Sequence, residues 1–287
     1  MGKINKKNAP YLFLIPFAVF FFVFMLYPLG FSLLLSFGKY KSGQLMITGF
    51  NNFRFVFTDP MFYKSIGNTF LIMAVQVPIM TFFALILAYF LNNRLVKGVG
   101  IFRMLVFMPI ILDAVSYSII FRLFFNADNG LFNNALRALG GTGPQWLSVG
   151  WLAQGVIIAV ITWRWTGYNT IILLSGMQSI SYDLYESASM DGATGIQKFI
   201  HITIPGVKPV LIFSVINSVN GTLQLFTEPF IITSGGPAYK TLTIVGYLYE
   251  KGFKGFDFGV ASAGSYVLVI IIAILTFIQL QVTKEKD

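Results

Sequence analysis

The chain has 287 residues, of which 56% are hydrophobic and only 11% are charged. A water-soluble domain carries about 25% charged residues, so the composition excludes a soluble globular protein and indicates an integral membrane protein. The net charge of +9 is carried mostly by short segments between apolar runs, which favours contact with anionic lipid headgroups over binding of nucleic acid.

Charge-poor apolar runs divide the chain into six predicted membrane-spanning helices, because a span needs about 20 mostly apolar residues. The first run is longer than the core of a signal peptide and lacks a small-residue cleavage site, so we interpret it as an uncleaved span. The six predicted spans are residues 11–37, 65–93, 104–121, 151–177, 209–233 and 258–283.

This pattern predicts an all-α integral membrane protein. It also suggests three parts of the chain. Residues 1–64 hold the N-terminal tail, the first span and an outer loop, residues 65–283 form a core of five spans, and residues 284–287 form a tail.

The orientation of the spans follows from Lys and Arg. Six spans place both termini on one side of the membrane. The basic residues are almost balanced between the two sides, but the short segments on the side of the termini are dense in positive charge. Short basic loops stay in the cytoplasm, so we expect both termini there, together with the loop 179–208.

This loop carries signals for two short helices. The signals are two capping boxes, at residues 183–186 and 194–197. Gly192 lies where the first helix needs a residue of left-handed conformation to end. Pro205 is expected to end the second helix.

Three ionisable residues lie within the predicted spans, where such residues are rare and usually face the bundle interior. Asp113 and Arg164 both fall near mid-depth, so we expect an ion pair that is either structural or part of a solute pathway. Glu228 is near the outer end of the fifth span, where a headgroup-level or vestibule position is expected.

Several kinds of chemistry are absent from the sequence. It has no Cys and a single His, His201, which leaves no disulfide, thiolate metal site or Cys nucleophile. It also lacks the G-x-x-x-x-G-K-[ST] phosphate loop and the G-x-S-x-G nucleophile elbow. We therefore expect no metal, no cofactor, no ATP bound in that loop and no catalysis by this chain.

A family resemblance lies in the loop 179–208. The loop reads Glu186-Ser-Ala-Ser-Met-Asp191-Gly192-Ala193, and then has Phe199, Ile202 and Ile204-Pro205. This resembles the EAA loop of permease subunits of binding-protein-dependent ABC importers, E-A-A-x-x-D-G-A followed by F-x-x-I-x-L-P. Ser187 and Ile204 depart from that pattern.

The resemblance implies that the loop is a cytoplasmic coupling helix that docks in a cleft of a partner ATPase. A plain amphipathic connector is the alternative. The predicted ATPase-coupling residues are Glu186, Ala188, Asp191, Gly192, Ala193 and Pro205.

A second resemblance concerns the solute. The segment Phe230-Ile-Ile-Thr-Ser-Gly-Gly-Pro237, with Thr241 and the run 247–253, is similar to the segment after the fifth span of maltose- and lactose-type sugar permeases. Residues 129–133 and 146–148 resemble their loop before the fourth span. The Thr-x-Gly-Gly-Pro feature resembles the maltose-F-like member of a permease pair, and it is also a plain turn signal.

Sugars bind to aromatic faces, amides and hydroxyl groups, and the fourth and fifth spans offer these groups. In the resembling family, the sugar site lies on these two spans. Aromatic residues in spans also serve as packing or belt residues. The predicted substrate-binding residues are Trp165, Tyr168, Ser218, Thr222, Gln224 and Leu225.

Together these resemblances imply a permease subunit that moves a sugar, an oligosaccharide or glycoside, across a bacterial cytoplasmic membrane. The implied partners are a second permease subunit, a cytoplasmic ATPase dimer and an extracytoplasmic sugar-binding protein. Alternatives are an importer of a polyol, glycerol-phosphate or other solute, a secondary transporter with its own ion-coupling residues, and a membrane enzyme.

Overall fold

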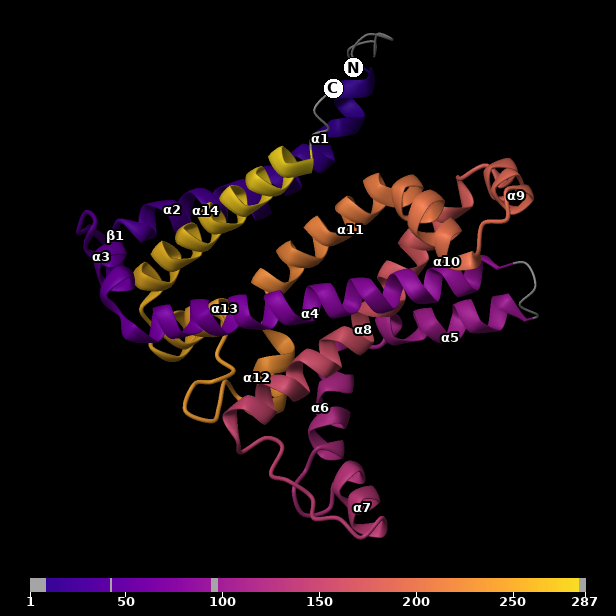
Figure 1. The fold of residues 1–287 in the computed structure, drawn as a ribbon. Helices are drawn as coiled ribbons and strands as arrows, with labels where there is room; N and C mark the ends of the chain where they lie inside the picture. Colours follow the sequence, from indigo (N-terminus) through magenta and orange to yellow (C-terminus); the bar gives the residue numbers. More distant parts are fainter. Residues whose placement is uncertain (1–8, 42, 94–97, 284–287) are drawn as a thin grey trace. The chain divides into compact units, whose positions relative to one another are not determined.

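The computed structural model describes residues 9–41, 43–93 and 98–283, which are mainly helical (Figure 1). The chain forms two compact units. The first contains the chain up to Pro60 and the segment Leu248–Ile271, and the second contains Met61–Tyr247 and the chain from Ile272 onward.

The first unit begins with a long apolar helical segment. It continues with an antiparallel hairpin, which the sequence did not predict, and a short helix. Its elements are α1 (Ala9–Phe21), η1 (Phe22–Leu26), α2 (Tyr27–Ser36), β1 (Gly38–Lys41), β2 (Gln44–Ile47), α3 (Asn51–Thr58), η3 (Glu250–Lys254) and the first part of α14 (Phe258–Thr283).

One buried amide side chain, that of Asn52, stabilises the first unit at the end of α2. The amide Nδ2 of Asn52 donates to the carbonyls of Leu35, Ser36 and Gly38 at 3.3, 3.1 and 2.8 Å. The Leu35 and Ser36 carbonyls lie at the C-terminal end of α2, where intrahelical partners run out, and Gly38 is the first residue of β1. A buried Asn therefore closes α2 and fixes the hairpin that follows.

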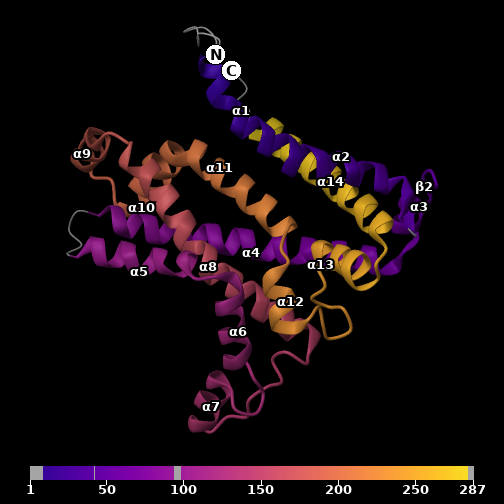
Figure 2. The same cartoon turned by 180° about the vertical axis from the view of Figure 1, so that it is seen from behind.

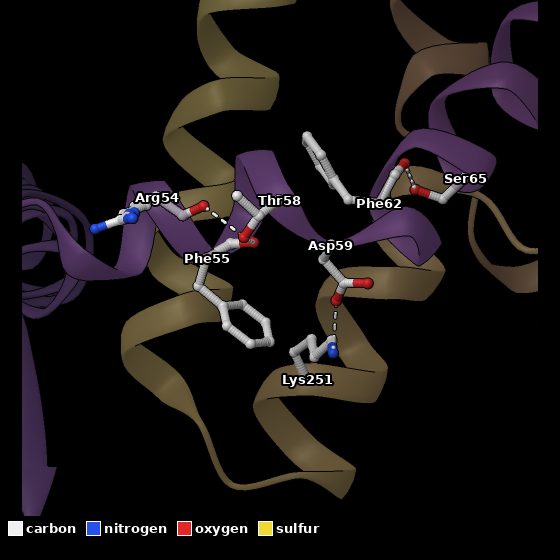
Figure 3. Close-up of polar contacts among 7 residues, drawn as sticks. All are labelled: Arg54, Phe55, Thr58, Asp59, Phe62, Ser65 and Lys251. Atoms are coloured by element: carbon white, nitrogen blue, oxygen red, sulfur yellow. Dashed lines mark hydrogen bonds and ion pairs between the residues drawn. The ribbon is translucent and has the colours of Figure 1, made fainter.

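An ion pair joins the end of α3 to η3 within the same unit. Lys251 Nζ lies 2.7 Å from the Asp59 carboxylate (Figure 3) and 4.9 Å from the centre of the Phe55 ring. Thr58 also donates to the carbonyl of Arg54 at 2.9 Å. The ion pair and the ring contact thus hold η3 against the end of α3.

The second unit holds most of the long helices. Its elements are α4 (Pro60–Asn92), α5 (Val99–Ile111), α6 (Ala114–Phe124), α7 (Leu131–Ala138), α8 (Gly150–Gln178), α9 (Tyr182–Met190), α10 (Gly195–Lys198), η2 (Phe199–Thr203), α11 (Ile204–Leu223), α12 (Thr227–Thr233), α13 (Ile244–Tyr249, which ends in the first unit) and the last part of α14.

Helix α8 is the centre of this unit, because α5, α11 and α12 pack against it (Figure 2). A Cβ at Gly167 would lie 1.7 Å from the carbonyl oxygen of Val106, so glycine is needed for the close approach of α5. Ala84 and Ala88 of α4 are fully buried in a cluster with Leu173 of α8. Small residues thus let the helices approach closely, as is typical of membrane bundles.

Five helical segments are long and apolar enough to cross a membrane, and the bent pair α5–α6 gives a sixth candidate. The predicted all-α membrane fold is therefore confirmed. The predicted third span, residues 104–121 interrupted at Asp113, is a bent pair in the structure, because α5 and α6 meet next to Asp113 at a 95° bend. Leu112 and Asp113 are extended there, and the Asp113 carboxylate accepts from the N–H groups of Val115 and Ser116, both at 3.0 Å.

The predicted fifth span also differs from the structure. Helix α11 begins at Ile204, ends at Leu223 and is followed by the separate helix α12. Pro205 does not end a helix, because α10, η2 and α11 form one continuous helix, Gly195–Leu223, and Pro205 lies in it just after the π-helix η2.

Candidate functional site

A small cavity lies between α4, α8 and α11 in the second unit. Five of the six predicted substrate-binding residues line it. The exception is Gln224, which is exposed and donates to the Asn220 carbonyl at 3.1 Å. The lining residues are Gln76, Met80, Ile161, Trp165, Tyr168, Asn169, Asn217, Ser218, Gly221, Thr222 and Leu225.

Asn169 organises the polar side of this cavity. It is only 2% exposed, and its Nδ2 donates to the Trp165 carbonyl at 3.0 Å. Its Oδ1 accepts from the hydroxyls of Ser214 and Ser218, while its Nδ2 also lies 3.2 Å from the Met80 sulfur. One buried amide therefore joins α4, α8 and α11 and orients the hydroxyl of Ser218.

Other polar and aromatic side chains also line this cavity. The Thr222 hydroxyl donates to Gln76 Oε1 at 3.1 Å, and the rings of Trp165 and Tyr168 meet edge to face at 5.8 Å. Gln76, Asn169 and Asn217 were not predicted from the sequence. Their signal was present, because an amide within an apolar span is expected to face other helices and not lipid.

The cavity volume is about 60 Å³, well below the roughly 300–1,000 Å³ of enclosed ligand pockets. It can hold only a few water molecules, at roughly 10–15 Å³ of such volume each. These side chains therefore form one wall of a binding site and do not enclose a solute.

The intramembrane charges do not pair as expected. The Asp113–Arg164 ion pair is contradicted, because the exposed Asp113 carboxylate caps α6 instead. The Arg164 guanidinium lies 4.6 Å from the centre of the Tyr117 ring, and Tyr117 donates its hydroxyl hydrogen to Glu228.

Glu228 lies in α12 and is buried, with 5% exposure. A short Asp side chain is well suited to its own helix N-terminus, whereas the longer Glu228 reaches across to α6. Arg164, Tyr117 and Glu228 thus link α8, α6 and α12.

The loop after α8 folds as the short helix α9, which ends at Gly192, followed by the start of a long helix that continues from Gly195 to Leu223. Gly192 has φ +79°, and the Ala193 N–H donates to the Ala188 carbonyl at 2.9 Å, which confirms the left-handed helix end. Thr194 and Gln197 form the expected reciprocal capping box. The first helix is capped by Ser181 rather than by Asp183.

The coupling segment, which we define as residues 181–203, consists of α9, α10 and η2, and its residues 195–203 continue without a break into α11. The Tyr185 hydroxyl lies 2.9 Å from Thr203 Oγ1 inside the segment. Tyr89 of α4 donates to the Gly195 carbonyl at 3.4 Å, and its ring lies 4.9 Å from that of Phe199. Every residue of α9 is exposed or half-buried.

The outer surface of this segment is apolar in places. Leu184, Ile196 and Met190 are 54%, 73% and 89% exposed, and the Glu186 side chain is exposed among them. Exposed apolar patches of this kind mark interaction sites. Of the other predicted coupling residues, Asp191 and Pro205 are exposed, whereas Ala188 and Ala193 are half-buried.

A second loop, the crest at Pro237–Lys240 between α12 and α13, has a strained backbone. Ala238 and Tyr239 have φ values of +46° and +59°, which non-glycine residues rarely adopt. Side chains of α4 and α8 bind its carbonyls. The donors are Lys64 to Ala238 at 2.6 Å, Asn68 to Tyr239 at 2.7 Å and Gln154 to Lys240 at 2.6 Å.

The crest and the coupling segment lie at opposite ends of the same helices (Figure 1). Lys64 and Asn68 are near the start of α4, whereas Tyr89 is near its end. The 33 residues of α4 extend roughly 50 Å, more than the roughly 30 Å of a bilayer core. The two loops are therefore farther apart along α4 than a bilayer core is thick.

Comparison with known proteins places the chain in one family. Residues 62–282 match the family described as "binding-protein-dependent transport system inner membrane component". The chain belongs to this family. It is therefore a permease subunit of an ABC importer and a multi-pass protein of the cytoplasmic membrane, and it is not an enzyme.

Curated relatives of this permease cover nearly its whole length. It is 41% identical to the lactose transport system permease protein LacF of Rhizobium radiobacter, over 96% of this chain and 94% of the relative. It is 34% identical to the arabinooligosaccharides transport system permease protein AraP of Bacillus subtilis, over 97% and 90%.

A solved structure shares the fold. A chain of a bacterial alginate ABC transporter, crystallised in complex with an alginate pentasaccharide-bound periplasmic protein, superimposes with a TM-score of 0.86. The match covers 98% of this permease and 96% of that chain, at 22% sequence identity.

Proposed function

We propose that this permease carries a sugar, an oligosaccharide or a glycoside, into the bacterial cytoplasm. The observation that supports this most is the wall between α4, α8 and α11, where the Trp165 and Tyr168 rings stand beside amide and hydroxyl groups. A few oriented polar groups among apolar ones are typical of small-molecule sites. Two relatives are named for sugars, lactose and arabinooligosaccharides.

The second half of the site comes from a second permease subunit. The cavity of about 60 Å³ is too small to enclose even one sugar ring. A facing subunit with its own polar wall would complete the pathway between the two. The permease therefore acts as part of a heterodimer.

On the side of the coupling segment, the partner is an ABC ATPase dimer that hydrolyses ATP. Exposed Leu184, Met190 and Ile196 form the apolar part of the contact, and Glu186 its acidic part. The capped ends at Ser181 and Gly192 keep α9 helical, so a push from the ATPase moves it as one body.

The crest lies on the opposite side and contacts an extracytoplasmic binding protein. Tyr239 is 52% exposed, and three side chains fix the carbonyls around it. This orientation places both termini in the cytoplasm. A reporter fused at Met190 is expected to report the cytoplasm and one at Tyr239 the exterior; the reverse result would overturn it.

The test of function is ATP-dependent uptake in vesicles that contain the full transporter and its binding protein. Trp165→Ala should reduce uptake of a labelled oligosaccharide at least tenfold, because it removes the aromatic face of the wall. Trp151→Ala is the matched control. Trp151 is on the same helix, 72% exposed, and outside the cavity.

Normal uptake by Trp165→Ala, or equal losses in both variants, would contradict the assigned site. ATP-dependent uptake of a polyol or glycerol-phosphate, without uptake of any oligosaccharide, would replace the sugar by that solute class. Uptake driven by an ion gradient without ATP would instead indicate a secondary transporter.

A further inference from the structure

A large open cavity of about 840 Å³ lies beside the coupling segment, at the ends of α4, α5 and α8. It is distinct from the small cavity of the transport pathway and shares no lining residue with it. Its polar lining consists of basic, tyrosine, amide and hydroxyl groups. Chief among these are Tyr89, Arg103, Gln178, Tyr185, Ser189 and Lys198.

Arg103 is the unusual member of this lining. Its Nε atom is buried and has no hydrogen-bond partner among the described residues. A guanidinium carries five N–H donors, and a buried donor without an acceptor is costly, the more so on a charged group. Because this Nε atom is itself buried, an acceptor in the cavity would be held by the terminal N–H groups of the same guanidinium.

The cavity carries positive charge without compensation from its own lining. Lys198 contributes a second cation, whose Nζ donates to Ser189 Oγ at 2.7 Å and has further donors to offer. Among the described residues that line the cavity, none is Asp or Glu. The exposed Asp183 and Glu186 of α9 are not part of the lining.

The start of α5 adds to this positive field. Val99 and Gly100 line the cavity at the N-terminal end of a 13-residue helix, where the helix dipole is positive. A Cβ at Gly100 would meet no described atom within 4 Å. The backbone there is open to a ligand.

An apolar surface continues from this cavity along α5. Ile101, Met104 and Leu105 are 63%, 62% and 53% exposed on a helix that is part of a candidate span. In a membrane this surface faces acyl chains, while the cavity lies at the helix ends, at headgroup depth. Basic pockets between membrane helices bind anionic lipid headgroups.

We propose that this cavity binds the phosphate of an anionic phospholipid, such as phosphatidylglycerol, from the leaflet on the side of the coupling segment. Arg103 on α5 and Lys198 on α10 hold the phosphate from two elements. The acyl chains lie along the exposed residues of α5. The lipid thereby adds a contact between α5 and the coupling segment.

The experiment measures lipid retention, so it does not depend on which solute the permease carries. The whole transporter is incorporated in nanodiscs of phosphatidylcholine and phosphatidylglycerol, extracted in detergent and analysed for bound lipid by mass spectrometry. We expect wild type to retain phosphatidylglycerol over phosphatidylcholine. Arg103→Gln and Lys198→Gln should each lose roughly tenfold of this preference, the size of one charge-assisted hydrogen bond.

Two matched variants control for the loss of charge alone. Arg54→Gln and Lys39→Gln remove exposed cations of the first unit and should leave the retention of phosphatidylglycerol unchanged. Arg103→Lys keeps the charge and should recover part of the preference. If Arg103→Gln fails to assemble, the wild-type preference and Lys198→Gln decide the question.

Three results would overturn the proposal. The first is equal retention of the two lipids by wild type. The second is an equal loss in the cavity variants and their controls. The third is full displacement of phosphatidylglycerol by millimolar inorganic phosphate, which would identify free phosphate as the ligand and not a lipid headgroup.

Discussion

The crest and the coupling segment are attached to the same helices in different ways. The crest has a strained backbone, and the helix side chains Lys64, Asn68 and Gln154 bind three consecutive carbonyls in it. In the coupling segment, α9 is ordered mainly by its own ends at Ser181 and Gly192, whereas residues 195–203, which include the π-helix η2, continue into α11. Tyr89 supplies its contacts to α4.

This difference separates a fixed surface from a movable one. A strained loop persists only where surrounding groups over-determine it, so the crest moves together with α4 and α8. The short helix α9 has its own caps and no fully buried residue, so it can change its position at a smaller cost. A transporter that passes motion from an ATPase to its helices needs the second kind of segment on the ATPase side.

The largest effect is expected from removing an anchor of the crest. Asn68 is 7% exposed and donates to the carbonyls of Tyr239 and Leu242 at 2.7 and 2.9 Å. Asn68→Ala leaves two carbonyls unpaired, so the free energy of unfolding should fall by about 2–4 kcal/mol. Thermal unfolding of the purified transporter measures this loss.

The exposed Asn129 provides the matched control, because Asn129→Ala removes an amide whose side chain binds no described residue. A transition temperature of Asn68→Ala equal to that of wild type would show that the crest does not depend on its anchors. The contrast with the coupling segment would then disappear.

The second-largest effect is expected from a substitution at Gly192, between α9 and α10. Gly192→Val places a β-branched residue at φ +79°, which costs about 1–2 kcal/mol locally and should deform the end of α9. We expect normal insertion in the membrane but at least fivefold weaker copurification of the ATPase. Gly192→Asn is the control, because Asn tolerates the left-handed conformation; equal defects in both would exclude the backbone explanation.

Local patterns in the sequence predicted much of this region correctly. Gly192 and the Thr194–Gln197 box depend on residues within a few positions of each other, and both are confirmed. The wall residues Trp165 and Ser218 were brought together by family resemblance, and the structure places both at one cavity.

The errors arise where a side chain has a choice of partners. Asp113 was paired with a distant Arg164, but the N–H groups of its own helix are closer and bind it instead. The anchors of the crest lie more than 170 positions away from it along the chain at Lys64 and Asn68. Such contacts leave no periodicity or spacing that a single sequence can reveal.

A smaller effect is expected from weakening a cap in the coupling segment. Thr194→Ala removes the hydroxyl that accepts from the Gln197 N–H at 3.3 Å, and the loss of an N-cap costs about 1 kcal/mol. Hydrogen exchange of residues 195–198 should become faster, while exchange of α4 stays unchanged. Thr48→Ala, in a loop of the first unit, is the control and should leave the segment unaffected.

The smallest effect on stability, but an informative one, is expected from Glu186. Its side chain is exposed and binds no described residue, so Glu186→Ala should change the transition temperature by less than about 1 °C, since such surface changes cost at most about 0.5 kcal/mol. ATP hydrolysis should nevertheless respond several-fold less to sugar-loaded binding protein, because an acidic contact to the ATPase is lost.

The matched control is Asp128→Ala, which removes an exposed carboxylate far from the coupling segment. A normal hydrolysis response in Glu186→Ala would exclude this carboxylate from the coupling contact. A large drop in stability would instead show that the segment is held more firmly than its contacts indicate.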